Sequence, residues 1–287
     1  MTWTAYRVVL RLRSPLHIGH LKVGNLQRTR HYVPGKTLWG ALTARLTREQ
    51  GRTDYTGKGS VGEQVHNELA FSYFYPAIDI DKPLYPNYTD EGLCYGPDEI
   101  TSDEFEWRLL NSYAATALAA QRASAEEGSL HETEFISPYL RSENNEEPKP
   151  VYLVGYVFEG EDCSLDWKKA LDRLQLGGER KYGWGRVCPT GQPTPANKLF
   201  GYELDELSGE RPVVTVQKNA PLLAHTNAND VKASGQIEPL IGRETKRGSE
   251  FGRQLSEEPQ ICWIPGSHVH EQTRLTIRWD GLWVETG

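Results

Sequence analysis

The order of strand-like and helix-like segments in the first 190 residues is the feature that most constrains the fold of this 287-residue chain. Apolar residues alternate with arginines near the N-terminus, which predicts a strand, and leucines recur every fourth residue at positions 38, 42 and 46, which predicts one face of a helix. Ser164 and Gly177 are suited to begin and end a second helix. The predicted segments are strands at 5–13, 71–78, 151–158 and 184–188, helices at 36–50 and 164–177, and an irregular stretch at 14–35.

Residues 79–150 interrupt this order, so we predict that they form an insertion. They are acidic and contain one helix-like stretch near 104–123. Without the insertion the order is β-α-β-β-α-β, which is that of a ferredoxin-like (RRM-type) domain.

Beyond a linker rich in proline and threonine, the chain contains mainly strand-like runs. They occupy 213–217, 260–264 and 275–284, and the last turns at Asp280-Gly281. The expected fold class is therefore α+β. A ferredoxin-like domain over 1–190, with a glycine-rich loop and the insertion at about 79–150, is followed by a mostly β domain over 191–287.

Charge is distributed unevenly along the chain. Residues 1–58 contain eleven lysines and arginines against two acidic residues, a formal charge of +9, although the whole chain carries −7. Residues 79–106 contain nine acidic residues and one lysine. The basic segment predicts a polyanionic or acidic partner, while the acidic insertion is either a solvated face or a docking surface for a basic neighbour.

A glycine-rich loop, GGERKYGWGR at 177–186, lies between the second predicted helix and the last strand of the first domain. Its four glycines allow close backbone approach to a ligand. Arg180, Lys181 and Arg186 add positive charge for phosphates, and Tyr182 and Trp184 add surfaces on which bases can stack. This combination indicates single-stranded RNA, although a tight turn leading into a strand would also use glycine.

Four segments together resemble motifs of the RAMP superfamily of CRISPR-associated proteins. They are SPLHIG at 14–19, YVPGKTLWGAL at 32–42, LHETEFI at 130–136 and the glycine-rich loop. The resemblance implies a subunit of a type III effector complex that is assembled around a guide RNA (CRISPR RNA), with the large subunit and the backbone RAMP subunits as further partners. Such complexes read sequence by base pairing, while the protein holds the RNA backbone.

The resemblance also distinguishes between the backbone subunits of type III complexes and their end-capping subunits. Backbone subunits of type III complexes cut target RNA with an aspartate in the loop after the first strand, and residues 14–36 contain no Asp or Glu. A backbone subunit therefore fits less well than the end-capping kind, which holds the repeat-derived 5′ handle of the guide RNA without catalysis. The residues expected to contact RNA are His17, Gly19, His20, Lys22, Arg28, Arg30, His31, Lys36, Gly178, Arg180, Lys181, Tyr182, Trp184 and Arg186.

Three histidines leave a second function open. A related branch of the superfamily comprises metal-independent endoribonucleases that process the precursor of the guide RNA with a histidine near neutral pKa. In that alternative His31, His17 and His20 would be the catalytic residues, whereas a non-catalytic subunit has none. In that branch, however, the glycine-rich loop usually lies close to the C-terminus, and about a hundred residues follow it here.

No cofactor, metal site or membrane segment is expected. The four cysteines are far apart and contain no C-x-x-C pair, which is typical of reduced thiols in the cytoplasm. No stretch approaches the roughly 20 apolar residues of a membrane helix.

A glycine-containing stretch near the C-terminus holds four further basic residues, Arg243, Lys246, Arg247 and Arg253. This stretch is either a second contact, for RNA or for a protein partner, or simply a polar loop.

Overall fold

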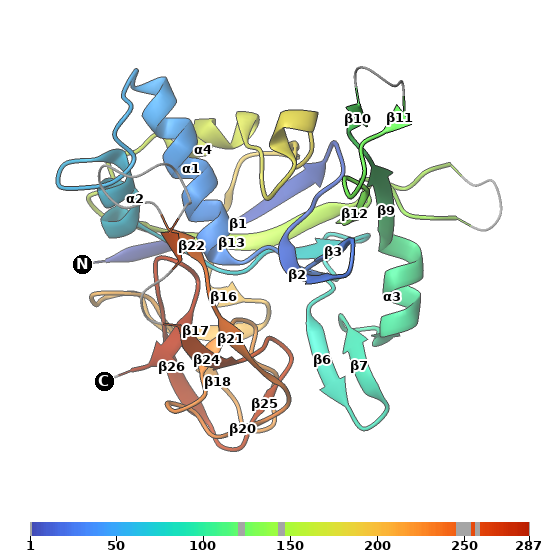
Figure 1. The fold of residues 1–287 in the computed structure, drawn as a ribbon. Coiled ribbons are helices and arrows are strands. Elements are labelled where there is room, and N and C mark those ends of the chain that lie inside the picture. The colour runs from blue at the N-terminus through green and yellow to red at the C-terminus, as the bar shows by residue number, and fades with distance from the viewer. Residues whose placement is uncertain (1, 120–123, 143–146, 245–253, 256–258, 287) are drawn as a thin grey trace.

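A central antiparallel sheet organises the protein, which is α+β with few helices and many strands. The structure, a computed structural model, describes residues 2–119, 124–142, 147–244, 254–255 and 259–286 (Figure 1). The sheet has the order β14-β1-β13-β4, with β15 and β5 as further partners of β1 and β13. Its strands are β1 (Trp3–Leu12), β4 (Leu69–Phe71), β5 (Tyr75–Ala77), β13 (Tyr152–Gly160), β14 (Val187–Pro189) and β15 (Thr194–Ala196).

Helices cover one face of this sheet (Figure 1). They are α1 (Gly35–Glu49), α2 (Val61–Glu68) and α4 (Trp167–Ala170), which continues into the 3-10 turn η1 (Leu171–Arg173). The predicted leucines at 38, 42 and 46 point into this layer and pack with Val8, Leu10 and Leu12 of β1. Each such buried aliphatic side chain stabilises the fold by about 1.5–3 kcal/mol.

The C-terminal strands cover the opposite face of the sheet. A second apolar core joins Trp3 and Phe158 of the central sheet to Val214, Leu275 and Trp283. These strands form an eight-stranded sheet of β16 (Lys198–Leu199), β17 (Tyr202–Glu206), β18 (Val213–Val216), β26 (Thr273–Ile277), β27 (Trp283–Glu285), β19 (Thr226–Asn227), β24 (Gln260–Trp263) and β21 (Ile237–Leu240). Two short pairs accompany it, β20 (Ala233–Ser234) with β25 (His268–Val269) and β22 (Arg243–Glu244) with β23 (Gln254–Leu255).

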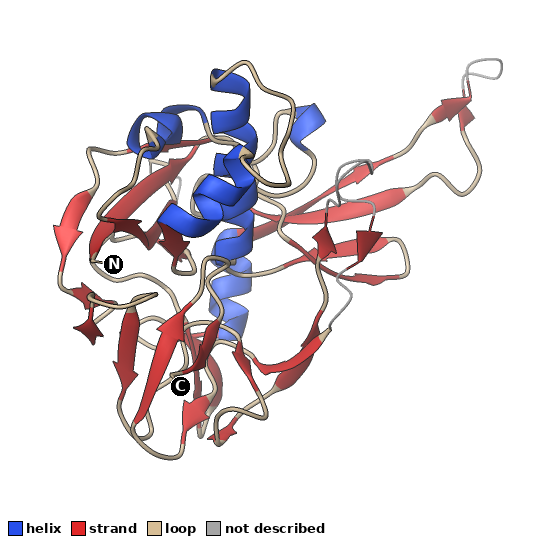
Figure 2. Cartoon of the chain, turned by 90° about the vertical axis from the view of Figure 1, so that its left-hand side faces the viewer, coloured by secondary structure: helices blue, strands red, loops and turns tan. Residues whose placement is uncertain are grey.

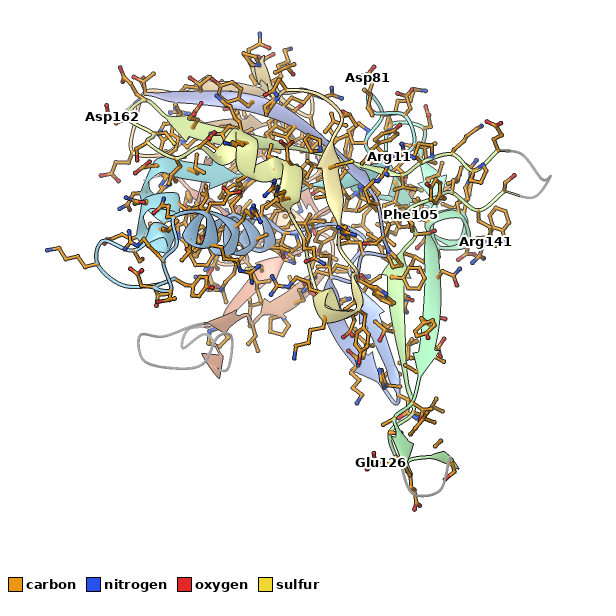
Figure 3. All side chains as sticks on the ribbon, turned by 90° about the horizontal axis from the view of Figure 1, so that it is seen from above. Arg11, Asp81, Phe105, Glu126, Arg141 and Asp162 are labelled. Atoms are coloured by element: carbon orange, nitrogen blue, oxygen red, sulfur yellow. The ribbon has the colours of Figure 1, made fainter. Side chains whose placement is uncertain are left out.

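A third sheet, with the order β2-β3-β12-β9, projects from the body as an arm (Figure 2). Its strands are β2 (Gly19–Val23), β3 (Leu26–Thr29), β9 (Leu110–Ala115) and β12 (His131–Ile136), and the pair β10 (Leu118–Ala119) and β11 (Ser124–Ala125) extends it. Figure 3 shows Glu126 at the end of this arm. Residues 86–109 form the small sheet β6 (Pro86–Thr89), β7 (Gly92–Tyr95) and β8 (Ile100–Thr101), followed by α3 (Ser102–Leu109).

Several predicted segments differ from the structure. The helix expected near 104–123 ends at Leu109, and the prediction is wrong over Leu110–Ala115, because these residues pair as β9 with β12 and tertiary pairing outweighs helix propensity. Residues 120–123 of that stretch lie outside the described residues. The stretch expected to be irregular contains the hairpin β2–β3. The strand expected at 71–78 is two short strands, and the helix expected at 164–177 is only α4 and η1.

The other expected elements agree with the structure within a few residues. The helix expected at 36–50 is α1, the strand at 151–158 is β13, and the C-terminal hairpin is β26–β27. No helix among the described residues is long and apolar enough to cross a membrane.

Candidate RNA-binding cleft

Hydrogen bonds join the glycine-rich loop to the turn that follows β1. The Gly178 N–H donates to the His17 carbonyl oxygen at 2.8 Å, and the Gly185 N–H donates to that of Pro15 at 2.7 Å. The Arg186 N–H donates to the Ser14 hydroxyl at 2.8 Å. Two motifs that are far apart in the sequence therefore form one structural unit.

Two positions in the loop require glycine. Gly177 and Gly185 have φ angles of 71° and 74°, in the left-handed region. A side chain at Gly177 would overlap the His17 carbonyl oxygen, and one at Gly185 would overlap that of Leu176. The glycines thus allow the loop to lie directly against the turn, while its exposed tip, the 3-10 turn η2 (Arg180–Tyr182), extends into solvent.

The loop and the basic N-terminal segment line one open cleft of about 510 Å³. Its remaining wall comes from the C-terminal part of the chain. Four cationic side chains and one carboxylate line it, namely Arg30, Lys36, Arg180, Arg278 and Asp280. Arg30 pairs with Glu238 and Arg278 with Asp280, so four cations face two carboxylates, and the remaining excess of positive charge in a concave site favours an anion.

Helix α1 begins at this cleft. Pro34, Lys36 and Thr37 line it, and the first turn of the helix contains no acidic residue. The N-terminal N–H groups and the dipole of a helix favour negative charge, so the start of α1 adds to the attraction of the cationic side chains. The hairpin turn Asp280-Gly281 packs against Gly35, so closely that a Cβ at Gly35 would lie 2.7 Å from the Asp280 carbonyl oxygen.

A carboxylate from the C-terminal part orients two of the predicted RNA-contact residues. Glu238 accepts hydrogen bonds from Arg30 Nη1 at 2.6 Å and from His20 Nε2 at 3.1 Å, and it contacts His225 Nε2 at 2.5 Å. The His225 ring is fully buried, and its Nδ1 lies 2.7 Å from the Tyr73 hydroxyl. We call these five residues the Glu238 network.

Electrostatics keep this network charged. Burial would raise the pKa of Glu238, but the hydrogen bonds from His20 and His225 and the charge of Arg30 outweigh it, and the pKa lies well below the usual range. Burial lowers the pKa of His225 despite its contact with the carboxylate. The network therefore holds an anionic Glu238 beside a cationic Arg30 and a neutral, buried His225.

The three histidines that sequence analysis singled out occupy different environments. His17 is buried, with its Nδ1 2.7 Å from the Glu134 carbonyl oxygen. His20 lines the cleft, while His31 stacks on Phe105 with ring centroids 4.9 Å apart. Burial, with the charges of Arg28 and His20, lowers the pKa of His31 to about 4.

The structure brings six of the predicted RNA-contact residues together in the cleft, namely Gly19, His20, Arg30, Lys36, Gly178 and Arg180. Lys22, Lys181, Tyr182 and Arg186 are exposed outside it. Trp184 is half-buried because it packs edge-on against Phe135, with ring centroids 5.0 Å apart. Arg28 and His31 line a second, adjoining pocket.

Sequence analysis missed the C-terminal wall of the cleft. Leu240, Ile241, Gln260 and Arg278 line it, and Glu238 supports it. The only signal was the glycine-containing basic stretch, whose first glycine, Gly242, also lines the cleft. The Arg243 side chain and the remaining basic residues of that stretch, Lys246, Arg247 and Arg253, lie outside the described residues.

Within the described part of the chain, no group of three His, Cys, Asp or Glu side chains is placed to hold a metal ion. The described cysteines Cys94, Cys163, Cys188 and Cys262 are free thiols.

No protein-family model matches this sequence, and no curated protein matches it. Among solved structures, a chain of the cryo-EM structure of the Type III-B Cmr-beta bound to cognate target RNA and AMPPnP, state 1, is similar, with a TM-score of 0.56 and 12% identity. The match covers 92% of this chain and 85% of that chain. A chain of the Type III-B Cmr-beta bound to cognate target RNA has a TM-score of 0.54 and 13% identity, over 92% of this chain and 86% of that chain. The likeness is one of fold, and it is consistent with the RAMP-type type III subunit that the motifs resemble.

Proposed function

We propose that this chain is a non-catalytic, RNA-binding subunit of a cytoplasmic type III CRISPR effector complex. It grips the repeat-derived 5′ handle of the guide RNA and docks the large subunit and the backbone subunits. The observation that carries the proposal is the single cleft in which the basic N-terminal segment, the start of α1 and the glycine-rich loop meet. A single strand would place its phosphates along Lys36 and Arg180, with a base on exposed Tyr182.

The arrangement of the central sheet supports the ferredoxin-like assignment of the first domain. Its antiparallel order β14-β1-β13-β4 places the first and third core strands, β1 and β13, at the centre. The helices that connect the strands lie on one face. We propose a domain boundary near residue 190, after which the chain adds β15 to β1 and continues into the C-terminal sheet.

The chemistry of the cleft gives less support to a histidine nuclease. A general acid or base works best with a pKa near the working pH, whereas His31 has a pKa of about 4 and lies against Phe105. His17 is buried, and His20 is held by Glu238. The lack of acidic residues over 14–36 also remains unfavourable for a target-cutting backbone subunit.

Titration with labelled RNA tests the proposal. The purified chain is mixed, in EDTA, with a 5′-handle RNA and with full repeat RNA over a salt series. We expect binding that weakens with salt and no cleavage of either RNA. Arg180→Ala should reduce the slope of log K against log salt by about 0.7, the contribution of one phosphate contact on a single strand.

Lys198→Ala is the matched control, because Lys198 is an exposed cation of the C-terminal sheet that pairs with Glu203 and does not line the cleft. It should leave the slope unchanged. A defined cut in the repeat RNA would contradict the proposal and favour the endoribonuclease. Equal salt slopes for both variants would show that the cleft is not where the RNA binds.

A further inference from the structure

A second pocket, of about 250 Å³, adjoins the cleft. It is lined by three separate parts of the chain, namely β2–β3, the insertion and the C-terminal part, and we call it the base pocket. His20 and Arg30 line both hollows, so these two side chains separate them. The volume lies below the roughly 300 Å³ at which pockets for drug-sized ligands begin, which suits a ligand the size of one nucleobase.

Aromatic rings make one side of the base pocket rigid. Tyr95 stacks on Phe105 with centroids 4.1 Å apart, and His31 stacks on the same ring. The His31 Nδ1 also lies 2.6 Å from the Tyr95 hydroxyl. Tyr88, Leu93 and the segment Ile264–Pro265 supply further apolar surface. Flat, apolar walls of this kind hold an unstacked base.

Polar groups in the same pocket remain accessible to a ligand. Ser102 and Glu106 are four residues apart on one face of α3, and both line the pocket. The Glu106 side chain is 43% exposed, and its ion pair with Arg28 is long, at 3.7 Å. Arg28 also donates to Glu134, at 3.4 Å. An acceptor group therefore lies beside a cationic donor at the opening.

We infer that the base pocket receives one unstacked guanine of the RNA strand that lies in the cleft. The inference rests on the proposed function. Guanine has two adjacent donors, N1–H and N2–H, beside the acceptor O6 on one edge. The Glu106 carboxylate can accept both donors, and Arg28 can donate to O6. Adenine, cytosine and uracil cannot present two neighbouring donors to one carboxylate.

Because His20 and Arg30 form the wall between cleft and pocket, one nucleotide can span both. Its phosphate lies with the cations of the cleft, and its base turns into the base pocket. The proposal thus assigns base selectivity at one position of the handle to Glu106, on the insertion, while affinity comes from the cleft.

Short RNAs separate these two contributions. The full chain is titrated, by fluorescence anisotropy at one salt concentration, with a hexamer of uridines and with hexamers that carry one central guanosine, adenosine or cytidine. We expect the guanosine hexamer to bind on the order of tenfold more tightly than the other three, within the range of one good bidentate base contact. Glu106→Gln should bring this advantage, measured against the all-uridine hexamer on the same variant, below about twofold.

Glu104→Gln is the matched control, since Glu104 lies two residues away on α3, pairs with Arg108 at 2.8 Å and does not line the pocket. It should keep the full guanosine preference. Equal affinity for all four hexamers, or a preference that survives Glu106→Gln, overturns the base pocket while the proposed RNA binding stands. Failure of every hexamer and of the handle RNA to bind overturns both.

Discussion

Replacing Glu238 with glutamine removes one negative charge from the Glu238 network and changes its shape very little. In the native protein this carboxylate accepts hydrogen bonds from Arg30 at 2.6 Å and His20 at 3.1 Å, and it contacts His225 at 2.5 Å. The Arg30 side chain is only 12% exposed and His225 is 0% exposed. The substitution therefore leaves a largely buried guanidinium without its counter-charge.

Breaking a buried ion pair from one side costs about 3–5 kcal/mol. The glutamine oxygen can still accept one hydrogen bond, so we expect the lower end, about 3 kcal/mol. In a chain of this size that loss corresponds to a decrease in Tm of roughly 6–12 °C. Because the glutamine holds Arg30 and His20 less firmly at the cleft than the carboxylate does, binding of the handle RNA should weaken as well.

Urea unfolding of Glu238→Gln and of a control, Glu203→Gln, measures the effect. Glu203 pairs with Lys198 at the same 2.6 Å, but the two side chains are 59% and 51% exposed. An exposed pair contributes about 0–1 kcal/mol. If both variants lose equally little stability, burial does not strengthen the Glu238 network, and our account of how the C-terminal part supports the cleft is wrong.

The stabilisation by Glu238 should be present above its ordinary pKa of 4.5 and decline as the pH falls below it, because its folded-state pKa is lowered.

Other predictions concern the glycine-rich loop and the histidines. Gly185→Ala should destabilise the protein by more than the roughly 1–2 kcal/mol of left-handed backbone strain, because a Cβ would overlap Leu176. Gly183→Ala, with φ 85° and open space around it, should cost only that strain. Equal losses of stability in the two variants would refute the packing argument. Tyr182→Ala, at a side chain that is 79% exposed, should weaken RNA binding by about 1–3 kcal/mol without changing Tm; unchanged affinity in anisotropy would exclude stacking there. Burial lowers the pKa of His31 to about 4, so the unfolded chain binds more protons than the folded chain between pH 6.5 and 4, and stability should fall as the pH is lowered through that window. His31→Phe should flatten this pH dependence of stability, measured by urea unfolding at several pH values. An unchanged pH dependence would contradict the lowered pKa of His31.

Sequence periodicity predicted the local elements of the first 190 residues well where neighbouring residues decide the structure. Helix α1 and strands β1 and β13 lie close to their expected bounds. It failed for the residues after Leu109, which form β9 because β12 pairs with them. It also failed for the hairpin β2–β3, because β2 is exposed along its whole length and β3 is partly buried along its length, so neither strand alternates clearly between buried and exposed residues.

The sequence by itself determined which groups are available for binding. It placed a basic segment, a helix start without acidic residues and a glycine-rich loop in order along the chain, because charge, periodicity and glycine positions are properties of short segments. Tertiary structure alone decided that Arg30 meets Glu238, 208 positions away, and that Asp280-Gly281 packs against the start of α1. Such pairings depend on how the C-terminal sheet covers the central sheet, and no local pattern of residues specifies that packing.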